Sequence, residues 1–388
     1  MGYYSEYLDQ NMNLQTLSLE RKRQLIRISE LRGGHDVIVY AADLNKGMAP
    51  ITISYDDLLA VKDQLSNLSG EALDLILETP GGSGEVAEDI IRLLRSRYDK
   101  LAVIVPGYAK SAGTIMAMAG DEILMEPASS LGPIDAQMAW QGKTFSAHAL
   151  LEGMKRLKAE VDATGSLNKA YIPILQGMSL GELQSAENSL TFAESLVTDW
   201  LVRYKFKNWT VHSSNGKAVT AEEKNERANT IATELCNQSH WLTHGRSIKV
   251  EDFDKMKLLV TDYTKDPKDA ALAEAIQRYY TLLQLTFATN IYKVYETSTS
   301  QVYRFASPML PGPPPGQSPD VAVVEVMCNN CRTRSTVQAN LDKKQPLRPG
   351  CVAFPADNRL KCAGCGTEID LSDLRRQIEL QTKKKVMG

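Results

Sequence analysis

The sequence has little net charge and no long apolar run. Its 388 residues hold 44 lysines and arginines against 47 acidic residues, a formal charge of −3, so the charge balance does not favour a nucleic acid or a membrane surface as partner. The basic run Lys383–Lys385 is interpreted as a solvated tail. No run of about 18 apolar residues is present, which excludes a transmembrane helix. Since the first residues are polar and unlike a signal peptide, we expect a cytoplasmic protein.

Cysteine is scarce as well, and its placement is uneven. Of the six cysteines only Cys236 lies outside the C-terminal part, where two C-x-x-C pairs occur, Cys328 with Cys331 and Cys362 with Cys365. Without a secretory signal this clustering favours metal ligands over disulfides. Four thiolates in two short turns are the tetrahedral set that structural Zn²⁺ prefers, so we predict a zinc ribbon with Cys351 as a bystander. Reduced buried cysteines and a redox pair are the alternatives.

The length and composition indicate a globular protein of two or three domains. Residues 307–320, SPMLPGPPPGQSPD, are rich in proline, which feeds neither a helix nor a sheet ladder, and should form a stiff spacer. We therefore predict a large first domain over 1–306, a linker over 307–320, and a zinc-ribbon domain with a basic tail over 321–388. The strand entering the first cysteine pair is expected at 321–327.

Apolar runs alternate with helical patterns in the first part of the chain. Strands are expected at 36–42, 73–79, 101–106 and 122–126, and helices at 18–32, 55–67, 84–97 and 111–119. This alternation predicts an α/β fold with a parallel sheet covered on both faces. From about 146 to 295 the pattern is nearly all helical, and Thr220 with Glu223 forms a capping box that begins one of these helices.

A glycine-rich turn, Thr79–Gly84, follows the strand expected at 73–79. Gly82-x-Gly84-x-x-Ala87 matches a dinucleotide fingerprint, but the next strand does not end in the acidic residue that a nucleotide fold requires. Consecutive glycines also allow bare backbone N–H groups to point outward, as an oxyanion hole needs.

Ser111 follows the next strand, at the turn into an apolar helix. A serine there can expose its hydroxyl while the N–H of Ala112 stabilises developing negative charge. The alternative is a serine that only caps the helix. Because parallel strands end at one edge of the sheet, Ser111 and the glycine turn are expected to lie together, which favours a nucleophile.

The segments LDLILETPGG, VIVPGYAKSAGTIMAMAGDEILMEP and SSLGPIDAQ, within 73–137, resemble the serine dehydrogenase proteinase family. These proteins are relatives of signal peptide peptidase A and of the Clp protease subunit, and a looser similarity extends over 15–265. The resemblance implies a ClpP/crotonase-like fold, a repeated β-β-α core with helical additions. It also implies Ser111 as nucleophile, an oxyanion hole of Gly82, Ala112 and Gly81, and an extended peptide substrate paired with the ETPGG edge.

The proton acceptor for Ser111 is harder to predict. The Clp protease uses a histidine, but the corresponding position here is Asp135. The signal peptide peptidases use a lysine carried on a later helix, which by resemblance indicates Lys155 or Lys158, with Lys155 preferred. A lysine with the ordinary pKa of about 10.4 must be buried to serve as a base at neutral pH. Either lysine could equally be a solvated surface residue, and His244 is interpreted as a packing residue.

These observations together predict a serine peptidase with a Ser/Lys dyad that hydrolyses peptide bonds in extended or unfolded polypeptides. By resemblance it is a homo-oligomer. Formation of an acyl-enzyme and its release by lysine-activated water need no cofactor, and the predicted zinc is structural. The zinc ribbon is a candidate site for a protein partner. The first alternative is a catalytically inactive ClpP-like adaptor that uses the ribbon for binding. Acyl-CoA chemistry of the crotonase type is disfavoured, because those enzymes generally use carboxylates.

Overall fold

A computed structural model describes residues 2–140, 143–212, 215–306, 320–382 and 384–387. The chain divides into two compact units, Met1–Ser307 and Pro308–Gly388, each with its own hydrophobic core. The proline-rich spacer predicted for 307–320 lies outside the described residues except for Asp320, so its stiffness stays a prediction.

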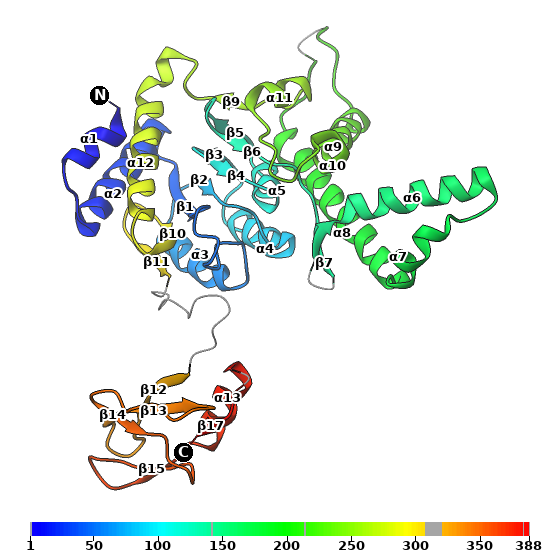
Figure 1. Ribbon diagram of the computed structural model, residues 1–388. Helices are drawn as coiled ribbons and strands as arrows, with labels where there is room; N and C mark the ends of the chain where they lie inside the picture. Colours follow the sequence, from blue (N-terminus) through cyan, green and yellow to red (C-terminus); the bar gives the residue numbers. More distant parts are fainter. Residues whose placement is uncertain (1, 141–142, 213–214, 307–319, 383, 388) are drawn as a thin grey trace. The chain divides into compact units, whose positions relative to one another are not determined.

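A seven-stranded sheet forms the centre of the first unit (Figure 1). In spatial order its strands are β11 (Gln301–Phe305), β10 (Ile291–Glu296), β1 (Asp36–Ala42), β2 (Ala72–Glu78), β3 (Lys100–Val105), β5 (Glu122–Met125) and β9 (Thr261–Asp262). The pairs from β1 to β9 are parallel, whereas β10 and β11 are antiparallel additions. The predicted parallel sheet is therefore confirmed.

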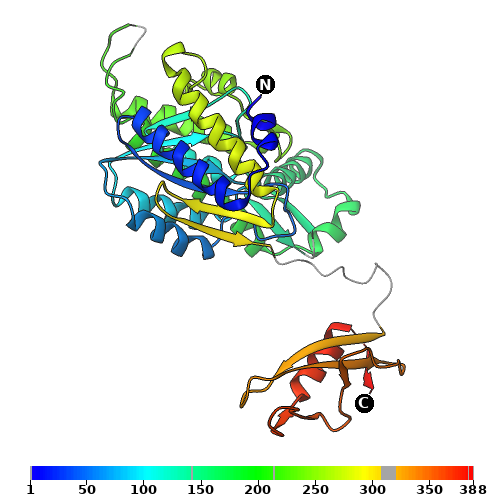
Figure 2. The ribbon, with the colours of Figure 1, turned by 90° about the vertical axis from the view of Figure 1, so that its left-hand side faces the viewer.

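Helices cover both faces of this sheet (Figures 1 and 2). One face carries α2 (Leu14–Leu31) and α12 (Ala270–Phe287), and the other carries α3 (Asp56–Ser66), α4 (Gly84–Arg95), α5 (Ala112–Met118), α8 (Leu180–Trp200) and α9 (Ala221–Cys236). Strand β1 shows the consequence, because Val37 and Val39 join one core while Ile38 and Tyr40 join the other. Burial on both faces explains why the strands are continuous apolar runs.

The first unit contains further α-helices and strands. They are α1 (Tyr3–Asp9), β4 (Tyr108–Ala109), β6 (Ser130–Leu131), β7 (Gln137–Trp140), β8 (Lys143–Ser146), α6 (Ala147–Thr164), α7 (Ile172–Gln176), α10 (Gln238–Trp241) and α11 (Val250–Lys255). Among the described residues, no helix is both long enough and apolar enough to cross a membrane.

The helical region predicted for 146–295 is confirmed in its greater part and wrong at its end. The capping box forms as predicted, since Thr220 Oγ1 accepts the N–H of Glu223 and the Glu223 carboxylate accepts the N–H of Thr220. The error is β10, which pairs with β1 directly after α12. Its sequence, IYKVYE, is rich in β-branched and aromatic side chains, which suit a strand, and pairing with β1 outweighs the helical pattern before it.

The second unit is a small β structure with one helix. It contains β12 (Val321–Met327), β13 (Arg334–Leu341), β14 (Cys351–Ala353), β15 (Arg359–Lys361), β16 (Glu368–Asp370), α13 (Ser372–Thr382) and β17 (Val386–Met387). Strand β12 begins and ends where the sequence predicted it. Among the described residues the core of this unit holds only eight buried residues, Val337 and Phe354 among them, so little apolar area stabilises it.

Candidate active site and metal centre

Ser111 adopts a backbone conformation that residues with a side chain rarely adopt. It lies between β4 and α5 with φ 50° and ψ −114°. Strain of this kind persists only where the surrounding structure enforces it, and such positions cluster at functional sites. The side chain forms no capping bond to α5, so the alternative of a simple helix cap is not supported. Among the described residues the Ser111 hydroxyl has no hydrogen-bond partner.

The glycine turn lies directly against this serine. A β-carbon added to Gly81 would fall 2.8 Å from Ser111 Cβ and 3.2 Å from the Ala112 nitrogen. Gly81 has φ 97° and Gly82 has φ 149°, values that a larger residue would adopt only under strain. The expected meeting of the two turns is therefore observed.

The backbone N–H groups of this region differ in their availability. The Gly81 N–H donates to Thr79 Oγ1 at 3.1 Å. In the described part of the chain the N–H groups of Gly82 and Ala112 have no acceptor. On one side of the turn the Ile53 N–H donates to the Gly81 carbonyl at 2.8 Å, so that edge is already occupied. Gly82 and Ala112 are therefore the free donors of the predicted oxyanion hole.

A cavity of about 660 Å³ opens in front of Ser111 and the glycine turn. Ile115, Ile134 and Phe192 give it an apolar wall, and Asp135 and His244 also line it. Its lining therefore combines a serine hydroxyl, free N–H donors, apolar side chains and three titratable groups, since Glu85 also lines it.

The structure does not bring the two predicted lysines to this cavity. Lys155 and Lys158 lie on α6, which together with α7 extends away from the sheet (Figure 1), and neither lines the cavity. The Lys155 side chain is 75% exposed and forms an ion pair with Glu152 at 3.0 Å, and Lys158 is exposed as well. Neither has the burial that a lysine base requires. The Ser/Lys dyad therefore stays a prediction, and the observed positions of Lys155 and Lys158 do not support it.

Lys110, next to Ser111 in sequence, is engaged elsewhere. Its Nζ donates to Ser130 Oγ at 3.0 Å, to the Leu131 carbonyl at 3.1 Å and to Ser247 Oγ at 3.2 Å. Burial, followed by the charge of Lys249, lowers the pKa of Lys110 to about 8. The side chain therefore connects β6 with the segment around Ser247 and does not line the cavity.

Sequence reasoning missed the pairing of His244 with Asp135. The Nδ1 atom of His244 lies 3.6 Å from Asp135 Oδ2, within the cavity of Ser111. The sequence placed both residues in family-like stretches, and that signal could have indicated a shared site. It could not indicate that the two residues meet, because they come from segments far apart in the chain.

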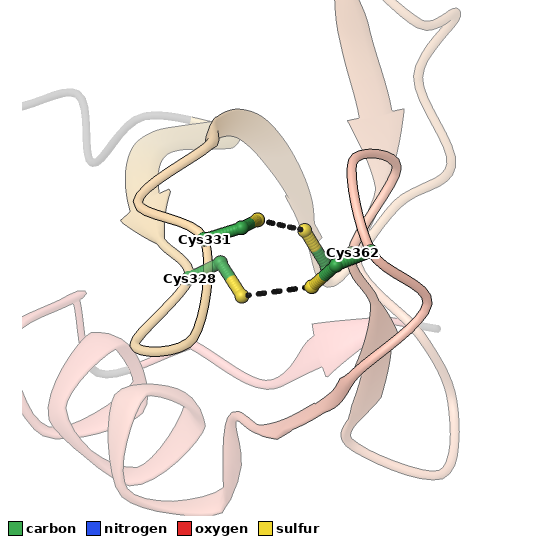
Figure 3. Close-up of side chains that lie close together, drawn as sticks. Cys328, Cys331 and Cys362 are labelled. Atoms are coloured by element: carbon green, nitrogen blue, oxygen red, sulfur yellow. Dashed lines mark hydrogen bonds between the residues drawn. The ribbon is translucent and has the colours of Figure 1, made fainter.

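The four predicted ligand cysteines converge in the second unit, and Figure 3 labels three of them, Cys328, Cys331 and Cys362. The Sγ atoms of Cys328, Cys331, Cys362 and Cys365 all lie within 4.8 Å of one another, with Cys328 to Cys365 at 3.6 Å and Cys331 to Cys362 at 3.5 Å. Tetrahedral Zn²⁺ with Zn–S bonds of about 2.3 Å requires sulfur separations near about 3.8 Å, so the cluster fits a metal of this kind. Cys351 is not part of the cluster.

The two C-x-x-C turns have the same backbone design. After the first pair, Arg332 donates its N–H to the Cys328 carbonyl at 2.8 Å, and after the second, Gly366 donates to the Cys362 carbonyl at 2.9 Å. Both residues have positive φ, 59° for Arg332 and 74° for Gly366. The first turn adopts the same backbone conformation as the second although Arg332 is not a glycine. This indicates that both turns are shaped to present a pair of sulfurs.

Comparison with known proteins agrees with the family resemblance. Residues 8–167 match the family model described as ClpP-like SDH-type serine proteinase, which confirms the resemblance and, with the parallel sheet, the ClpP-like fold class. Two uncharacterized proteins of Methanocaldococcus jannaschii are similar to part of the chain. MJ1495 is 38% identical over 84 residues, 22% of this chain and 27% of the relative, and MJ0137 is 44% identical over 66 residues, 17% of this chain and 23% of the relative. The chain thus matches about a quarter of either relative.

Among solved structures, a mutant of the 1510-N membrane-bound stomatin-specific protease is similar to this chain. The alignment has a TM-score of 0.30 and 15% sequence identity and covers 54% of this chain and 73% of that one.

Proposed function

We propose that this protein is a serine peptidase with Ser111 as its nucleophile, starting from the match of residues 8–167 to the ClpP-like SDH-type serine proteinases. One observation carries the proposal. Ser111 meets the N–H groups of Gly82 and Ala112, which are unpaired among the described residues, in a single cavity. A nucleophile next to two free donors is the arrangement that acyl transfer requires.

The chemistry follows from these groups. Ser111 Oγ attacks the carbonyl carbon of the scissile amide, and the carbonyl oxygen becomes an oxyanion that the N–H groups of Gly82 and Ala112 stabilise. Collapse of this intermediate expels the amine and leaves an ester on Ser111. Water then hydrolyses the ester and frees the serine. Loss of one such donor reduces turnover by about 10²–10³-fold in known enzymes.

The substrate is proposed to be an extended polypeptide with an apolar residue near the scissile bond. Ile53 occupies one edge of the glycine turn, and the Gly82 carbonyl on the other side has no donor among the described residues. A strand-like substrate can donate to that carbonyl while the Gly82 N–H binds the oxyanion. The apolar wall formed by Ile115, Ile134 and Phe192 suits an aliphatic or aromatic side chain.

The test is peptidase activity together with labelling by a fluorophosphonate probe. The wild-type protein should cleave short apolar peptides and carry the label on Ser111, and Ser111→Ala should abolish both. Ser189→Ala is the matched control, because Ser189 lines the same cavity and donates its hydroxyl to the Ser185 carbonyl. Cleavage by Ser111→Ala at the wild-type rate would overturn the proposal, and absence of labelling in folded wild-type protein would favour the inactive adaptor.

We further propose that the cysteine cluster holds a structural zinc ion. Thiolate ligands in a closed tetrahedral set leave no position for a substrate, and the small core of the second unit gives the metal a stabilising role. Hydrogen bonds with Thr367 lower the pKa of the Cys365 thiol to about 6, which favours the thiolate form that binds metal.

Assembly of several copies is proposed to involve α6 and α7. These helices form an arm that bears an exposed groove lined by Met154, Leu157, Ile174 and Leu175. Apolar area of this kind is commonly covered by another chain. Leu157→Glu should shift the protein to a smaller species in light scattering after size exclusion, whereas Ala159→Glu, exposed on the same helix outside the groove, should not.

A further inference from the structure

We infer that the imidazole of His244, oriented by the carboxylate of Asp135, accepts the proton of the Ser111 hydroxyl. This inference rests on the proposed peptidase function and assigns the base that the function needs. All three side chains line the same cavity. The arrangement would make the site a serine–histidine–aspartate system in place of the predicted Ser/Lys dyad.

The backbone register explains why His244 and Asp135 meet. Leu131 and Ile248 form an antiparallel bridge, in which each N–H donates to the carbonyl of the other at 3.1 and 3.0 Å. In antiparallel segments, residues equally far from such a bridge in opposite directions lie opposite each other. Asp135 is four residues after Leu131, and His244 is four residues before Ile248. The bridge therefore brings the two segments together with the carboxylate and the imidazole side by side.

Several contacts hold this segment pair in place. Lys110 Nζ connects the two segments through the Leu131 carbonyl and Ser247 Oγ, and Ile248 is fully buried. The Trp241 indole N–H donates to the Glu234 carbonyl at 2.7 Å, which fixes the start of the segment that carries His244. The histidine is thus anchored on both sides by buried or hydrogen-bonded residues.

The surroundings of Asp135 suit a carboxylate that orients a histidine. Asp135 is buried and accepts hydrogen bonds from Ser146 Oγ at 2.5 Å and from Gln137 Nε2 at 2.6 Å. In the described part of the chain, His244 is the only cation-forming side chain within 4.0 Å of this carboxylate. A buried carboxylate without a counter-charge is costly, and an imidazolium at His244 would supply one.

The two nitrogens of His244 are suited to different tasks. Nδ1 is buried, lies 3.6 Å from Asp135 Oδ2 and has no hydrogen-bond partner among the described residues. A small closure would let an N–H at Nδ1 donate to Asp135, which leaves the lone pair on Nε2 free to accept a proton. Catalytic hydrogen bonds are often long before substrate binds and tighten in the complex.

The proton balance is complete with water as the co-reactant. As Ser111 Oγ forms its bond to the substrate carbon, the hydroxyl proton passes to Nε2 of His244. The imidazolium, stabilised by Asp135, returns this proton to the amide nitrogen as the C–N bond breaks. In the second half, Nε2 takes a proton from water, whose oxygen attacks the ester, and returns it to Ser111 Oγ.

The first experiment compares histidine and lysine variants of the full-length protein on a short apolar peptide. We expect His244→Gln to reduce kcat by at least about 100-fold with little change in KM, since general base catalysis typically contributes about 10²–10⁴-fold. The control His240→Gln removes a histidine that is 52% exposed and outside the cavity, and should leave kcat within about twofold of wild type. The Lys155→Ala/Lys158→Ala double variant should likewise keep kcat within about twofold of wild type. Loss of activity in the lysine variant with retention in His244→Gln would overturn the inference.

Chemical rescue separates a catalytic role from a structural one. His244→Gly should regain activity when imidazole is added, whereas the wild type and His240→Gly should not respond. Asp135 is a positioning residue, so Asp135→Asn should reduce kcat in the wild type and have little further effect in His244→Gln. Equal effects of Asp135→Asn in both backgrounds would overturn its assignment.

Failure of this inference can be told apart from failure of the proposed function. If Ser111→Ala is inactive while His244→Gln retains wild-type turnover, Ser111 is the nucleophile and only the assignment of His244 is wrong. If Ser111→Ala keeps wild-type activity, the proposed function itself is wrong, and the inference is wrong with it.

Discussion

Gly81 lies against Ser111 so closely that no side chain fits between them. A β-carbon on Gly81 would sit 2.8 Å from Ser111 Cβ and 2.6 Å from the Lys110 carbonyl oxygen. The position of the glycine turn and that of Ser111 are therefore coupled through direct contact. Any displacement of Gly81 would therefore also displace Ser111, which brings the proposed oxyanion donors and the serine hydroxyl under one constraint.

Gly81→Ala should consequently lower both kcat/KM and the free energy of unfolding. The new methyl group must displace the Ser111 turn, and φ of 97° is strained for alanine. We expect kcat/KM to fall by about 100-fold or more, as for loss of an oxyanion donor, and the free energy of unfolding to fall by about 1–3 kcal/mol. Kinetics and urea unfolding measure the two effects. Gly47→Ala is the control, since nothing lies within 4 Å of its added β-carbon, and near-wild-type kinetics for Gly81→Ala would contradict the coupling.

A buried ion pair supports the opposite side of the glycine turn. Lys293 Nζ lies 2.7 Å from Asp57 Oδ1, each side chain is 2% exposed, and Nζ also donates to the Thr52 carbonyl at 2.8 Å. Asp57 Oδ2 in turn accepts the Ser54 N–H at 2.9 Å. These contacts flank Ile53, the residue that pairs with the turn, so the ion pair connects the core to the candidate active site.

Lys293→Met should therefore lower the free energy of unfolding by about 3–5 kcal/mol, because it leaves the Asp57 carboxylate buried without a counter-charge. Adding Asp57→Asn should recover part of this loss, which denaturant titration of the single and double variants would show. Lys268→Met removes an ion pair whose side chains are 75% and 47% exposed, and should leave the free energy of unfolding close to that of the wild type. Additive losses in the Lys293/Asp57 double variant would argue against the coupling.

Much of the fold could be predicted because its signals are local. The strand observed as β1 has the predicted bounds, and β2, β3 and β5 differ from theirs by no more than one residue at either end, since buried apolar runs with flanking turn residues mark them. Ser111 and the cysteine pairs were likewise predicted from short motifs. Strand β10 was missed because its identity depends on the partner β1, which the sequence does not reveal.

The proton acceptor could not be predicted for the same kind of reason. The position of His244 depends on the bridge between Leu131 and Ile248, a tertiary contact with no local signature. Lys155 and Lys158 were predicted because the signal peptide peptidases carry their lysine on a helix at a similar distance along the chain after the serine. The helix that carries them extends away from the sheet, so sequence spacing does not place either lysine in the cavity of this chain.

Glu78, at the end of β2, should make stability depend on pH. Burial raises the pKa of this carboxyl from 4.5 to about 8, against the lowering effect of hydrogen bonds from the Tyr108 N–H and the Tyr280 hydroxyl. The folded state therefore keeps a proton that the unfolded state releases above pH about 4.5. The contribution of this group to stability is complete below that pH and is lost as pH rises through about 8, with a slope of about 1.4 kcal/mol per pH unit.

Glu78→Gln should remove this slope. The glutamine carbonyl can accept the Tyr108 N–H, and its amide can donate to the Tyr280 oxygen. The free energy of unfolding of the variant should therefore equal that of the wild type near pH 5 and exceed it at pH 8. Urea unfolding at several pH values is the measurement. Glu71→Gln, at an exposed position, is the control, and its free energy of unfolding should depend on pH in the same way as that of the wild type. A constant difference between Glu78→Gln and wild type across this range would show that Glu78 does not hold the proton.

The cysteine cluster should bind one metal ion that stabilises the second unit. Cys328→Ser should lose zinc, measured as metal content per chain, and should make residues beyond the proline-rich segment sensitive to protease, because the small core then lacks its metal cross-link. Cys351→Ser is the matched control, since Cys351 lies outside the cluster, and it should retain both zinc and protease resistance. Treatment of the wild type with a strong chelator should reproduce the Cys328→Ser behaviour. Equal zinc loss in both serine variants would place Cys351 among the ligands, and full protease resistance after complete metal removal would show that the core alone is sufficient.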